Sequence, residues 1–325
     1  MTGWTGTVCG TVTRLPFQFA LDLADDGFVV GHSDRHRAMS WHATTGTTRW
    51  YGGIEGGLPS DLTAVSPGGR VAGTARVAGP RYDIAKAVRV QGPLPLVPVD
   101  RSTSRDDRVR AVNDANTVVG MSLLNGSPYR AEAFVWTDRR RVLDPPPGTW
   151  TWTEAVAINA SGWVLGRAWG TDAAGSSARR VLLWSPTGAV TALPPLADGA
   201  ELLPVALTDD GLVIGLRLAA DGRGDAVVAW TAVGGYDVVA APTPNGSPVT
   251  LSVSDADADG TVVGAVRDER ATPPLLPFLY EAGVGFRLMV DADGVPLPSV
   301  PSAVNDGHEA LVVVDGRSSL WTPCR

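Results

Sequence analysis

Lysine is nearly absent from this chain. Lys86 is the only lysine among 27 basic residues, and all the others are arginines. Schiff-base chemistry needs a lysine amine, so it has a single candidate here. That candidate lies in the strand-like run Ile84–Val90, where a structural role is the stronger expectation.

Cysteine and long apolar runs are also scarce. Two cysteines, Cys9 and Cys324, cannot form a zinc site of several cysteines. No apolar run approaches the roughly 18 residues that a membrane-spanning helix needs. The first residues carry neither the basic stretch nor the apolar segment of a secretory signal. The sequence therefore predicts a cytoplasmic protein, or an extracellular one if a signal was trimmed.

Positive charge is missing as well. The formal net charge is −7, and no basic stripe runs along the sequence. Nucleic-acid binders neutralise phosphates with clustered arginine and lysine, and anionic membranes attract basic surfaces. We therefore expect no nucleic-acid partner and no membrane partner. The expected partner is a small molecule, and the expected state is a monomer.

Glycine and proline, in contrast, are abundant, with 38 and 25 residues in a chain that is 44% apolar. This composition indicates many tight turns rather than disorder. One pattern recurs: a small apolar pair, then Asn, Thr or Asp, a turn, and a Val-x-Gly ending. Its clearest copies are Ala111–Gly120, Ala157–Gly166 and Ala206–Gly215. The closing glycines, at positions 31, 73, 120, 166, 215 and 264, recur every 42 to 49 residues.

An aromatic residue ends a short apolar strand after most copies of this pattern. The second copy has Arg89 at that place. Each repeat is therefore interpreted as four short strands, and no segment has a helical period. Such repeats are typical of β-propellers. The prediction is an all-β fold: a seven-bladed β-propeller of four-stranded blades, forming one domain over residues 1–325. The aromatic markers are Trp41, Trp136, Trp184, Trp230, Tyr280 and Trp321.

The two ends of the chain complete each other. The last repeat, residues 301–325, has only three strands, and Thr7–Leu15 is a spare strand before the first repeat. We expect this N-terminal strand to close the last blade by pairing antiparallel with Ser318–Thr322, because an open ring would expose unpaired edges. The pairing places Cys9 beside Cys324, as a disulfide or as adjacent thiols according to the compartment.

The repeat resembles the HAF repeat, a family named for a His-Ala-Phe triplet in its third strand. The closest copy is Ala133-Phe134-Val135-Trp136, with Glu132 where that histidine would stand. The Ala-x-Asn and x-Val-x-Gly halves match best in blades three and four. The resemblance covers nearly the whole chain and implies a propeller fold. Because its motifs are structural, it implies no mechanism, and the family is associated with extracellular proteins.

The densest polar cluster is His32-Ser33-Asp34-Arg35-His36-Arg37, directly after the second strand of blade one. Loops at this place share a face with the connections between blades. Two histidines and an aspartate there could bind a metal or perform acid–base chemistry, and the alternative is a solvated hairpin. The candidate catalytic residues are His32, Asp34, His36 and Glu154, the last from a connection on the same face.

Tryptophans are concentrated in Pro147–Glu154, which we interpret as the connection between blades three and four. Exposed tryptophans in a loop need a ligand or a packing partner, and an aromatic-rimmed funnel is typical of a small-molecule site. The alternative is that these rings cover blade edges. The candidate substrate-binding residues are Tyr82, Tyr129, Arg130, Trp150, Trp152 and Trp169.

An acidic segment, Asp255-Ala256-Asp257-Ala258-Asp259-Gly260, has the Asp-x-Asp-x-Asp-Gly form of a calcium loop. Asp255, Asp257 and Asp259 are therefore candidate ligands of a calcium ion. The next ligand position would be Val263, which cannot coordinate, so an ordinary acidic turn is the stronger interpretation.

Two functions from different classes fit these observations. The first is an enzyme without a cofactor, a cyclase, isomerase or lyase of specialised metabolism, acting in the central funnel. The lack of cofactor-binding motifs, the lack of a signal peptide and the tryptophan-rich loops favour it. The alternative is a non-catalytic propeller that binds or scaffolds a protein or glycan, because fold alone does not decide function.

Overall fold

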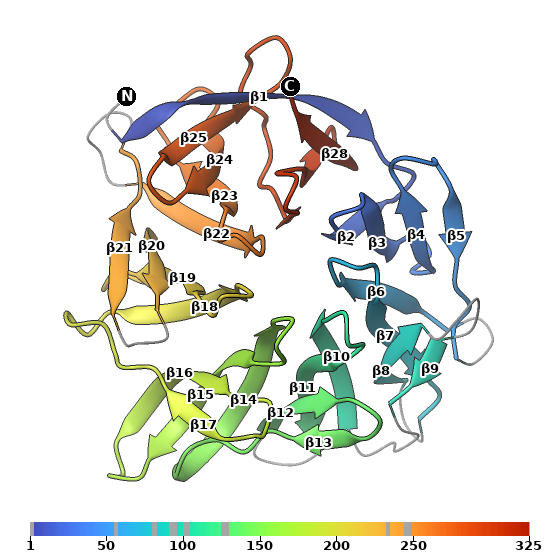
Figure 1. Ribbon diagram of the computed structural model, residues 1–325, viewed down its shortest axis with the longest axis vertical. Coiled ribbons are helices and arrows are strands. Elements are labelled where there is room, and N and C mark those ends of the chain that lie inside the picture. Colours follow the sequence, from blue (N-terminus) through green and yellow to red (C-terminus); the bar gives the residue numbers. More distant parts are fainter. Residues whose placement is uncertain are drawn as a thin grey trace. The chain divides into compact units, whose positions relative to one another are not determined.

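A computed structural model describes residues 3–54, 58–79, 83–90, 96–99, 105–124, 130–231, 235–243 and 249–324. Over these ranges the regular secondary structure is entirely β, in strands β1 to β28 (Figure 1). The all-β prediction is confirmed. The described residues hold no helix with the length and apolarity to cross a membrane. The chain forms two compact units, Phe17–Leu193 and Met1–Pro16 with Pro194–Arg325.

The unit Phe17–Leu193 consists of consecutive four-strand repeats. Two of them form separate sheets, β2 to β5 and β6 to β9. The next two are joined where Ala131 of β12 pairs in parallel with Trp152 of β14. The strands are β2 (Phe19–Leu23), β3 (Phe28–His32), β4 (Ala38–His42), β5 (Thr48–Trp50), β6 (Ser60–Val65), β7 (Val71–Val77), β8 (Ile84–Val90), β9 (Leu96–Pro98), β10 (Arg105–Val112), β11 (Val118–Leu124), β12 (Arg130–Trp136), β13 (Arg140–Val142), β14 (Gly148–Ile158), β15 (Val164–Asp172), β16 (Ser177–Trp184) and β17 (Val190–Ala192).

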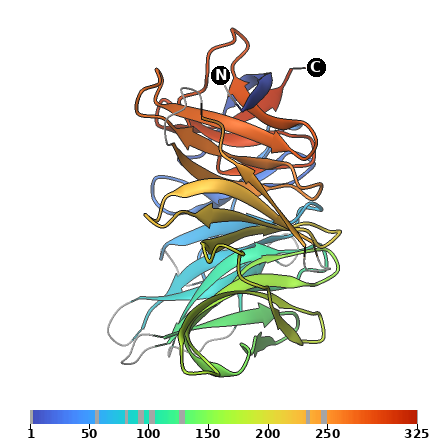
Figure 2. The same ribbon diagram turned by 90° about the vertical axis from the view of Figure 1, so that its left-hand side faces the viewer.

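The other unit contains a four-stranded sheet, β18 to β21, and an eight-stranded sheet in the order β22-β23-β24-β25-β1-β28-β27-β26. The first strand, blue in Figure 2, lies among the orange and red strands of the chain's last part. The seven-blade count and the single domain over 1–325 stay predictions. The strands are β1 (Trp4–Arg14), β18 (Glu201–Leu207), β19 (Val213–Leu218), β20 (Gly224–Trp230), β21 (Tyr236–Ala240), β22 (Thr250–Ala256), β23 (Val262–Arg267), β24 (Leu275–Glu281), β25 (Gly285–Val290), β26 (Ala303–Val304), β27 (Ala310–Val314) and β28 (Arg317–Pro323).

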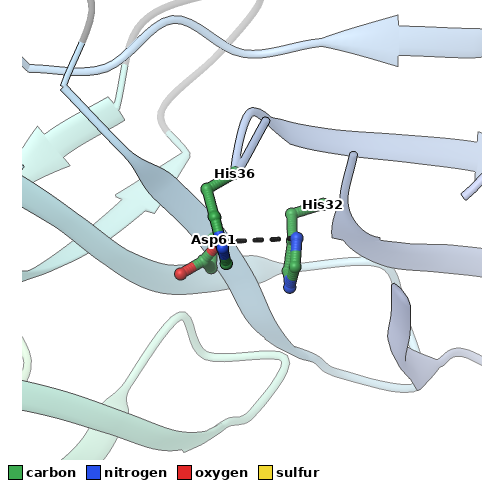
Figure 3. Close-up of side chains that lie close together, drawn as sticks. All are labelled: His32, His36 and Asp61. Carbon is green, nitrogen blue, oxygen red and sulfur yellow. Dashed lines mark hydrogen bonds and ion pairs between the residues drawn. The ribbon is translucent and has the colours of Figure 1, made fainter. Parts of the chain in front are cut away.

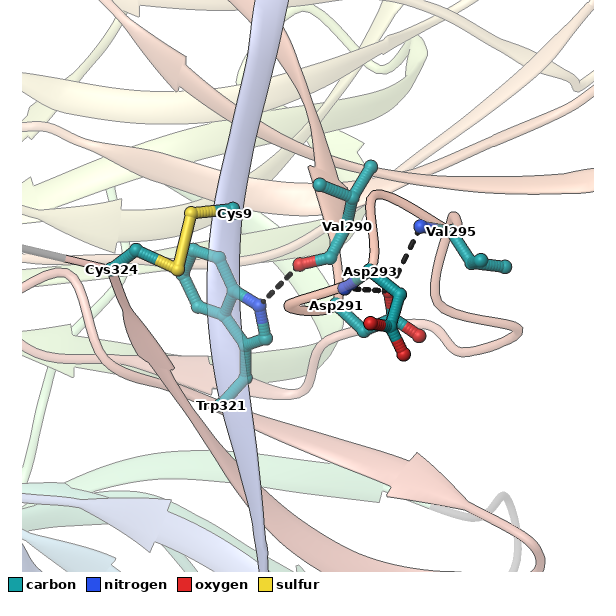
Figure 4. Close-up of a disulfide and its surroundings, with 7 residues drawn as sticks. All are labelled: Cys9, Val290, Asp291, Asp293, Val295, Trp321 and Cys324. Atoms are coloured by element: carbon teal, nitrogen blue, oxygen red, sulfur yellow. Dashed lines mark hydrogen bonds between the residues drawn. A yellow bond between two sulfur atoms is a disulfide. The ribbon is translucent and has the colours of Figure 1, made fainter.

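The strand β1 pairs with a different neighbour along each half of its length. Its second half, Gly10–Arg14, runs antiparallel to Ser319–Pro323 of β28, as the sequence predicts. Its first half runs parallel to β25, a pairing that the sequence analysis did not foresee. The cysteines are adjacent as predicted: a disulfide joins Cys9 to Cys324, with their Cα atoms 5.5 Å apart (Figure 4).

A shared backbone irregularity explains the closing glycine of each repeat. The first strand of the repeat carries a bulge opposite that glycine, for example between Val109 and Ala111 opposite Gly120. The bulge brings the carbonyl oxygen of Arg108 so close that a Cβ on Gly120 would lie 2.0 Å from it. Gly31, Gly73, Gly166 and Gly264 have the same relationship at 2.0–2.1 Å. Only glycine fits where another backbone approaches so closely.

The polar residue of the repeat caps its turn. The side-chain oxygen of Asn113 accepts a hydrogen bond from the amide of Thr117 at 3.0 Å, and Asn159 accepts one from the amide of Trp163 at 2.9 Å. In addition, the Nδ2 group of Asn113 donates to the carbonyl of Asn159 in the next repeat, at 3.0 Å. The same side chain thus closes its own turn and bonds to the neighbouring repeat.

The aromatic markers lie in the core, except Trp41, which is only partly buried. Trp136, Trp184, Trp230 and Trp321 are at most 3% exposed. The exception at Arg89 is also packed: its guanidinium lies 4.4 Å from the ring centre of Trp136 and donates to the carbonyl of Thr137 at 2.7 Å. A cation over an aromatic face thus replaces one aromatic side chain of the series.

Candidate acid–base site

His32, His36 and Asp61 form the cluster of titratable side chains that stands out in the unit Phe17–Leu193 (Figure 3). One potential ligand atom from each of the three lies within 4.8 Å of the others. His36 Nδ1 lies 3.3 Å from Asp61 Oδ1, and His32 Nδ1 lies 3.8 Å from the same oxygen. The imidazole rings are stacked, with centres 4.6 Å apart and planes 22° apart.

The turn between β3 and β4 holds His36 in place. The amide of His36 donates to the carbonyl of Ser33 at 3.1 Å, and the amide of Ser33 donates to the carbonyl of Arg37 at 3.1 Å. His36 itself has a φ of 50°, in the left-handed region. For a residue with a Cβ this conformation costs on the order of 1 kcal/mol, and such strain recurs at functional sites.

The same turn is attached to the neighbouring sheet that supplies Asp61. The carbonyl of His36 accepts a hydrogen bond from the amide of Ser60 at 2.8 Å, where β6 begins. The hydroxyl of Ser60 accepts one from the amide of Ala38 at 3.3 Å. Because Asp61 follows Ser60 directly, these two bonds bring its carboxylate to the histidine pair.

Hydrogen bonding places the proton on Nδ1 in both rings. His32 Nδ1 lies 2.8 Å from the carbonyl oxygen of Ser33, which can only accept, so this nitrogen carries the proton. In His36 a proton on Nδ1 faces the carboxylate of Asp61, which leaves Nε2 with the lone pair. His32 is buried and His36 is exposed, with side-chain exposures of 10% and 57%. His36 is therefore the ring that a ligand can reach.

A cavity of about 520 Å³ opens beside His36. This volume is in the range of small-molecule sites. Its wall combines charged, aromatic and small residues from the β3–β4 turn, the end of β5 and the start of β6. The lining residues are Arg35, His36, Arg37, Trp50, Tyr51, Gly52, Gly53, Leu58 and Ser60.

The tryptophans singled out in the sequence lie elsewhere and in strands. Trp150 and Trp152 belong to β14 and Trp169 to β15, so the expected loop positions are wrong. The rings of Trp152 and Trp169 stack at 5.4 Å, and Trp152 packs against a buried cluster that includes Met121. The reason is that β14 and β15 extend into one long hairpin, which takes in all three tryptophans. Among the described residues, none of the three lines the cavity beside His36.

Glu154 is a buried member of an ion-pair network. Its side chain is 2% exposed, Arg110 lies 2.6 Å from one of its oxygens, and Arg167 lies 2.9 Å from the other. It is not part of the three-residue cluster of His36. Lys86 is likewise fully buried, 3.4 Å from Asp107. Both observations agree with structural roles, because buried charges are retained where they are paired.

The remaining sequence candidates are divided between the surface and the residues outside the described ranges. Asp34 is exposed at the tip of the β3–β4 turn, and Arg130 is exposed at the start of β12. Tyr82 and Tyr129 lie outside the described residues.

The acidic loop after β22 uses its carboxylates on backbone amides. Asp255 accepts from the amide of Val304 at 3.0 Å, and Asp257 accepts from the amide of Thr261 at 2.7 Å. Asp257 occupies the turn-capping place of Asn113, and burial raises its pKa to about 6. Among the described residues, the trio with Asp259 does not form a cluster at metal-binding spacing. Calcium binding here stays a prediction.

Sequence reasoning missed Asp61 and the aromatic wall of the cavity. Asp61 stands one residue before the bulge of its strand, the place that Arg108 and Glu154 occupy in later repeats. A charged residue recurring at one register position was the available signal. No comparable signal existed for Trp50 and Tyr51, since only the tertiary structure brings them to the turn of His36.

Solved structures with a similar fold cover nearly the whole chain at low sequence identity. Virginiamycin B lyase from Staphylococcus aureus is 10% identical over 96% of this chain and 97% of that chain, with a TM-score of 0.59. A streptogramin B lyase structure is 11% identical over 97% of both chains, with a TM-score of 0.56. YCF48 from Cyanidioschyzon merolae is 14% identical over 97% of this chain and 98% of that chain, with a TM-score of 0.51.

These similarities establish the fold, which is that of β-propeller proteins. No protein-family model matches the chain, and no curated protein matches its sequence. Membership of the HAF-repeat family therefore stays a prediction.

Proposed function

We propose that this protein is an enzyme without a cofactor that binds a small molecule beside His36 and catalyses proton transfer at carbon, as a lyase or isomerase. The observation that carries the proposal is the hydrogen-bonded pair of His36 and Asp61 at the wall of a cavity of about 520 Å³. A histidine oriented by a carboxylate is a common general base. Such a base must first lie within hydrogen-bonding distance of the proton it removes, and its pKa matters only after that.

The chemistry follows from the protonation sites. His36 Nε2 takes a proton from a carbon of the bound molecule, and the electron pair of that C–H bond forms a new double bond. In an elimination, the bond to a leaving group breaks on the next carbon, and the imidazolium returns its proton to that group. In an isomerisation, the proton returns to a different carbon. Asp61 stabilises the imidazolium in between.

His32 supports this pair as a positioning residue. Its buried ring stacks on the ring of His36 and is held by the carbonyl of Ser33. The position of the His36 ring is thereby restricted from one face by His32 and at one edge by Asp61. Preorganisation of this kind makes proton transfer efficient, because little reorientation is needed during the reaction.

A metal centre is the second candidate function of the same residues, because two histidines and one carboxylate within 4.8 Å are a common ligand set. The protonated Nδ1 of His32, bonded to Ser33, and the stacked rings favour the acid–base alternative.

The test is consumption of small molecules by the purified chain. Wild type, His36→Gln and Asp61→Asn are incubated with small-molecule extracts, and mass spectrometry follows which compounds disappear and which form. We expect at least one substrate–product pair of equal mass, or differing by a small eliminated molecule, that is lost in His36→Gln and strongly reduced in Asp61→Asn. Folding of each variant is checked by its melting temperature.

Three results would contradict the proposal. Turnover that survives in both variants would place the chemistry elsewhere. Compounds that bind to the protein but are never converted would indicate the non-catalytic binding protein instead. Activity that a chelator removes and Zn²⁺ or Mn²⁺ restores would indicate the metal centre.

A further inference from the structure

The cavity beside His36 has a basic rim in an acidic protein. Arg35 and Arg37 both line it, on either side of His36 in the sequence, while the whole chain carries a net charge of −7. Both arginines are exposed. Among the described residues neither guanidinium has an ion-pair partner, in contrast to Arg110, Arg167 and Arg217, which all pair with carboxylates.

An exposed aromatic surface faces the same space. Trp50, at the end of β5, lines the cavity and is 53% exposed, which is unusual for so large an apolar side chain. Tyr51 beside it is fixed: its hydroxyl lies 3.2 Å from that of Ser40, and the guanidinium of Arg49 lies 5.0 Å from its ring centre. The cavity therefore offers an exposed indole next to a fixed wall.

We propose that the substrates of this site are organic acids with an apolar or aromatic body, bound through their carboxylate by Arg35 and Arg37 and through their body by Trp50. The proposal rests on the proposed function of His36 and names the substrate class for it. Guanidinium groups bind carboxylates through paired N–H donors, with a geometry that a neutral amide cannot satisfy. An indole face gains contact area with an apolar body and favours aromatic partners.

The reaction itself needs this charge arrangement. When His36 removes a proton from a carbon next to a carboxylate, negative charge develops on the carboxylate oxygens. Two guanidiniums at those oxygens stabilise that charge. Their interaction with the carboxylate is stronger in the transition state than in the bound substrate, because the negative charge has increased. The base and the anion-binding groups come from one turn, Ser33–Arg37, whose internal hydrogen bonds hold the backbone of all three residues in place.

The test is calorimetric titration at low ionic strength with three probes: phenylacetate, its neutral analogue phenylacetamide, and inorganic phosphate. We expect phenylacetate to bind at least tenfold more tightly than phenylacetamide. The Arg35→Gln/Arg37→Gln double variant should lose at least tenfold in phenylacetate affinity. The matched control is Arg70→Gln, since Arg70 is exposed in the next repeat and does not line the cavity; it should bind like wild type.

A further variant tests the aromatic part. Trp50→Ala should weaken phenylacetate about tenfold and leave phosphate unchanged. Equal affinities for phenylacetate and phenylacetamide, or an unchanged double variant, would overturn the anion site. Phosphate binding as tight as phenylacetate, with no effect of Trp50→Ala, would overturn the organic acid in favour of an inorganic anion.

The inference and the proposed function can fail separately. His36→Gln should keep phenylacetate binding within about threefold of wild type, because the arginines and Trp50 remain. Selective carboxylate binding in a chain that converts no compound would overturn the enzyme and keep the anion site. Conversion of neutral molecules that depends on His36, with no preference for carboxylates, would overturn the anion site and keep the enzyme.

Discussion

Cys9 and Cys324, 315 positions apart in sequence, are joined by a disulfide where β1 passes from β25 to β28. The amide of Cys324 also donates to the carbonyl of Cys9 at 2.8 Å. Beside them the indole of Trp321 donates to the carbonyl of Val290, at 3.0 Å (Figure 4). The covalent link and the backbone bond hold β1 to the end of the chain, and the indole bonds β28 to β25, the two strands between which β1 lies.

Removing this disulfide is expected to lower the stability of the chain. Cys324→Ser should reduce the free energy of unfolding by about 2–4 kcal/mol, because the unfolded chain gains the freedom that a link between distant residues removes. Urea unfolding with and without dithiothreitol measures it. Reductant should destabilise wild type by the same amount and leave a Cys9→Ser/Cys324→Ser variant unaffected. If dithiothreitol left the unfolding free energy of wild type unchanged, the disulfide would have no stabilising role.

The closing glycine of the repeat is expected to tolerate no side chain. Gly120→Ala should lower the free energy of unfolding by about 3 kcal/mol or more, because its Cβ would lie 2.0 Å from the carbonyl oxygen of Arg108 and the bulge would have to move. Gly52→Ala is the matched control, since its Cβ would have no neighbour within 4 Å. Equal melting temperatures for the two variants would show that the bulge is free to move.

Asp257 is expected to make stability depend on pH. Burial raises its pKa to about 6, so between about pH 4 and 6 the folded chain binds the proton more tightly than the unfolded chain. The unfolding free energy must then fall as pH rises through this range, by up to about 3 kcal/mol. Asp257→Asn should flatten this fall and stabilise the chain at pH 8.

The structural precedent for that variant lies in the chain itself, since Asn113 and Asn159 cap the corresponding turns. An asparagine keeps the acceptor for the amide of Thr261 and removes the buried charge. Asp259→Asn is the control, because Asp259 is exposed. The measurement is the urea midpoint of each variant from pH 4 to 8. If Asp257→Asn kept the steep pH dependence of stability, that dependence would belong to another titratable group.

Glu154 is expected to matter for stability rather than for catalysis. Glu154→Gln should cost about 3 kcal/mol, because Arg110 and Arg167 would lose the carboxylate that pairs with both. The exposed pair of Asp221 and Arg223 supplies the control, and Asp221→Asn should unfold at the same urea midpoint as wild type, because water screens an exposed pair. Loss of turnover in a Glu154→Gln variant of unchanged stability would restore its catalytic role.

Much of the fold could be predicted because it rests on local or repeated signals. The Val-x-Gly ending marks a bulge opposite a glycine, and the bulge leaves the same trace in the six repeats that end in this glycine. The antiparallel partner of β1 followed from counting strands, since a spare strand and a missing strand complement each other. The parallel pairing of Trp4–Cys9 with β25 left no such trace, because parallel neighbours impose no turn between them.

The site could be predicted only in part. His32 and His36 were visible because both stand in one short turn, and a turn is a local unit of sequence. Trp150, Trp152 and Trp169 were misplaced because a β-hairpin that extends beyond its repeat looks like a connection when judged by spacing alone.

The sequence by itself determined the strands, the turns, the glycine positions and the pairing of the chain's two ends, since each depends on short-range sterics, hydrogen bonding or simple completeness. Only the tertiary structure decided which carboxylate meets the histidines. Asp61 reaches His36 because its neighbour Ser60 makes one backbone and one side-chain hydrogen bond to the turn of His36. Glu154, at the corresponding place of its own repeat, meets two arginines instead. Identical register positions acquire different chemistry because their neighbours come from other strands, and those neighbours are set by packing between sheets.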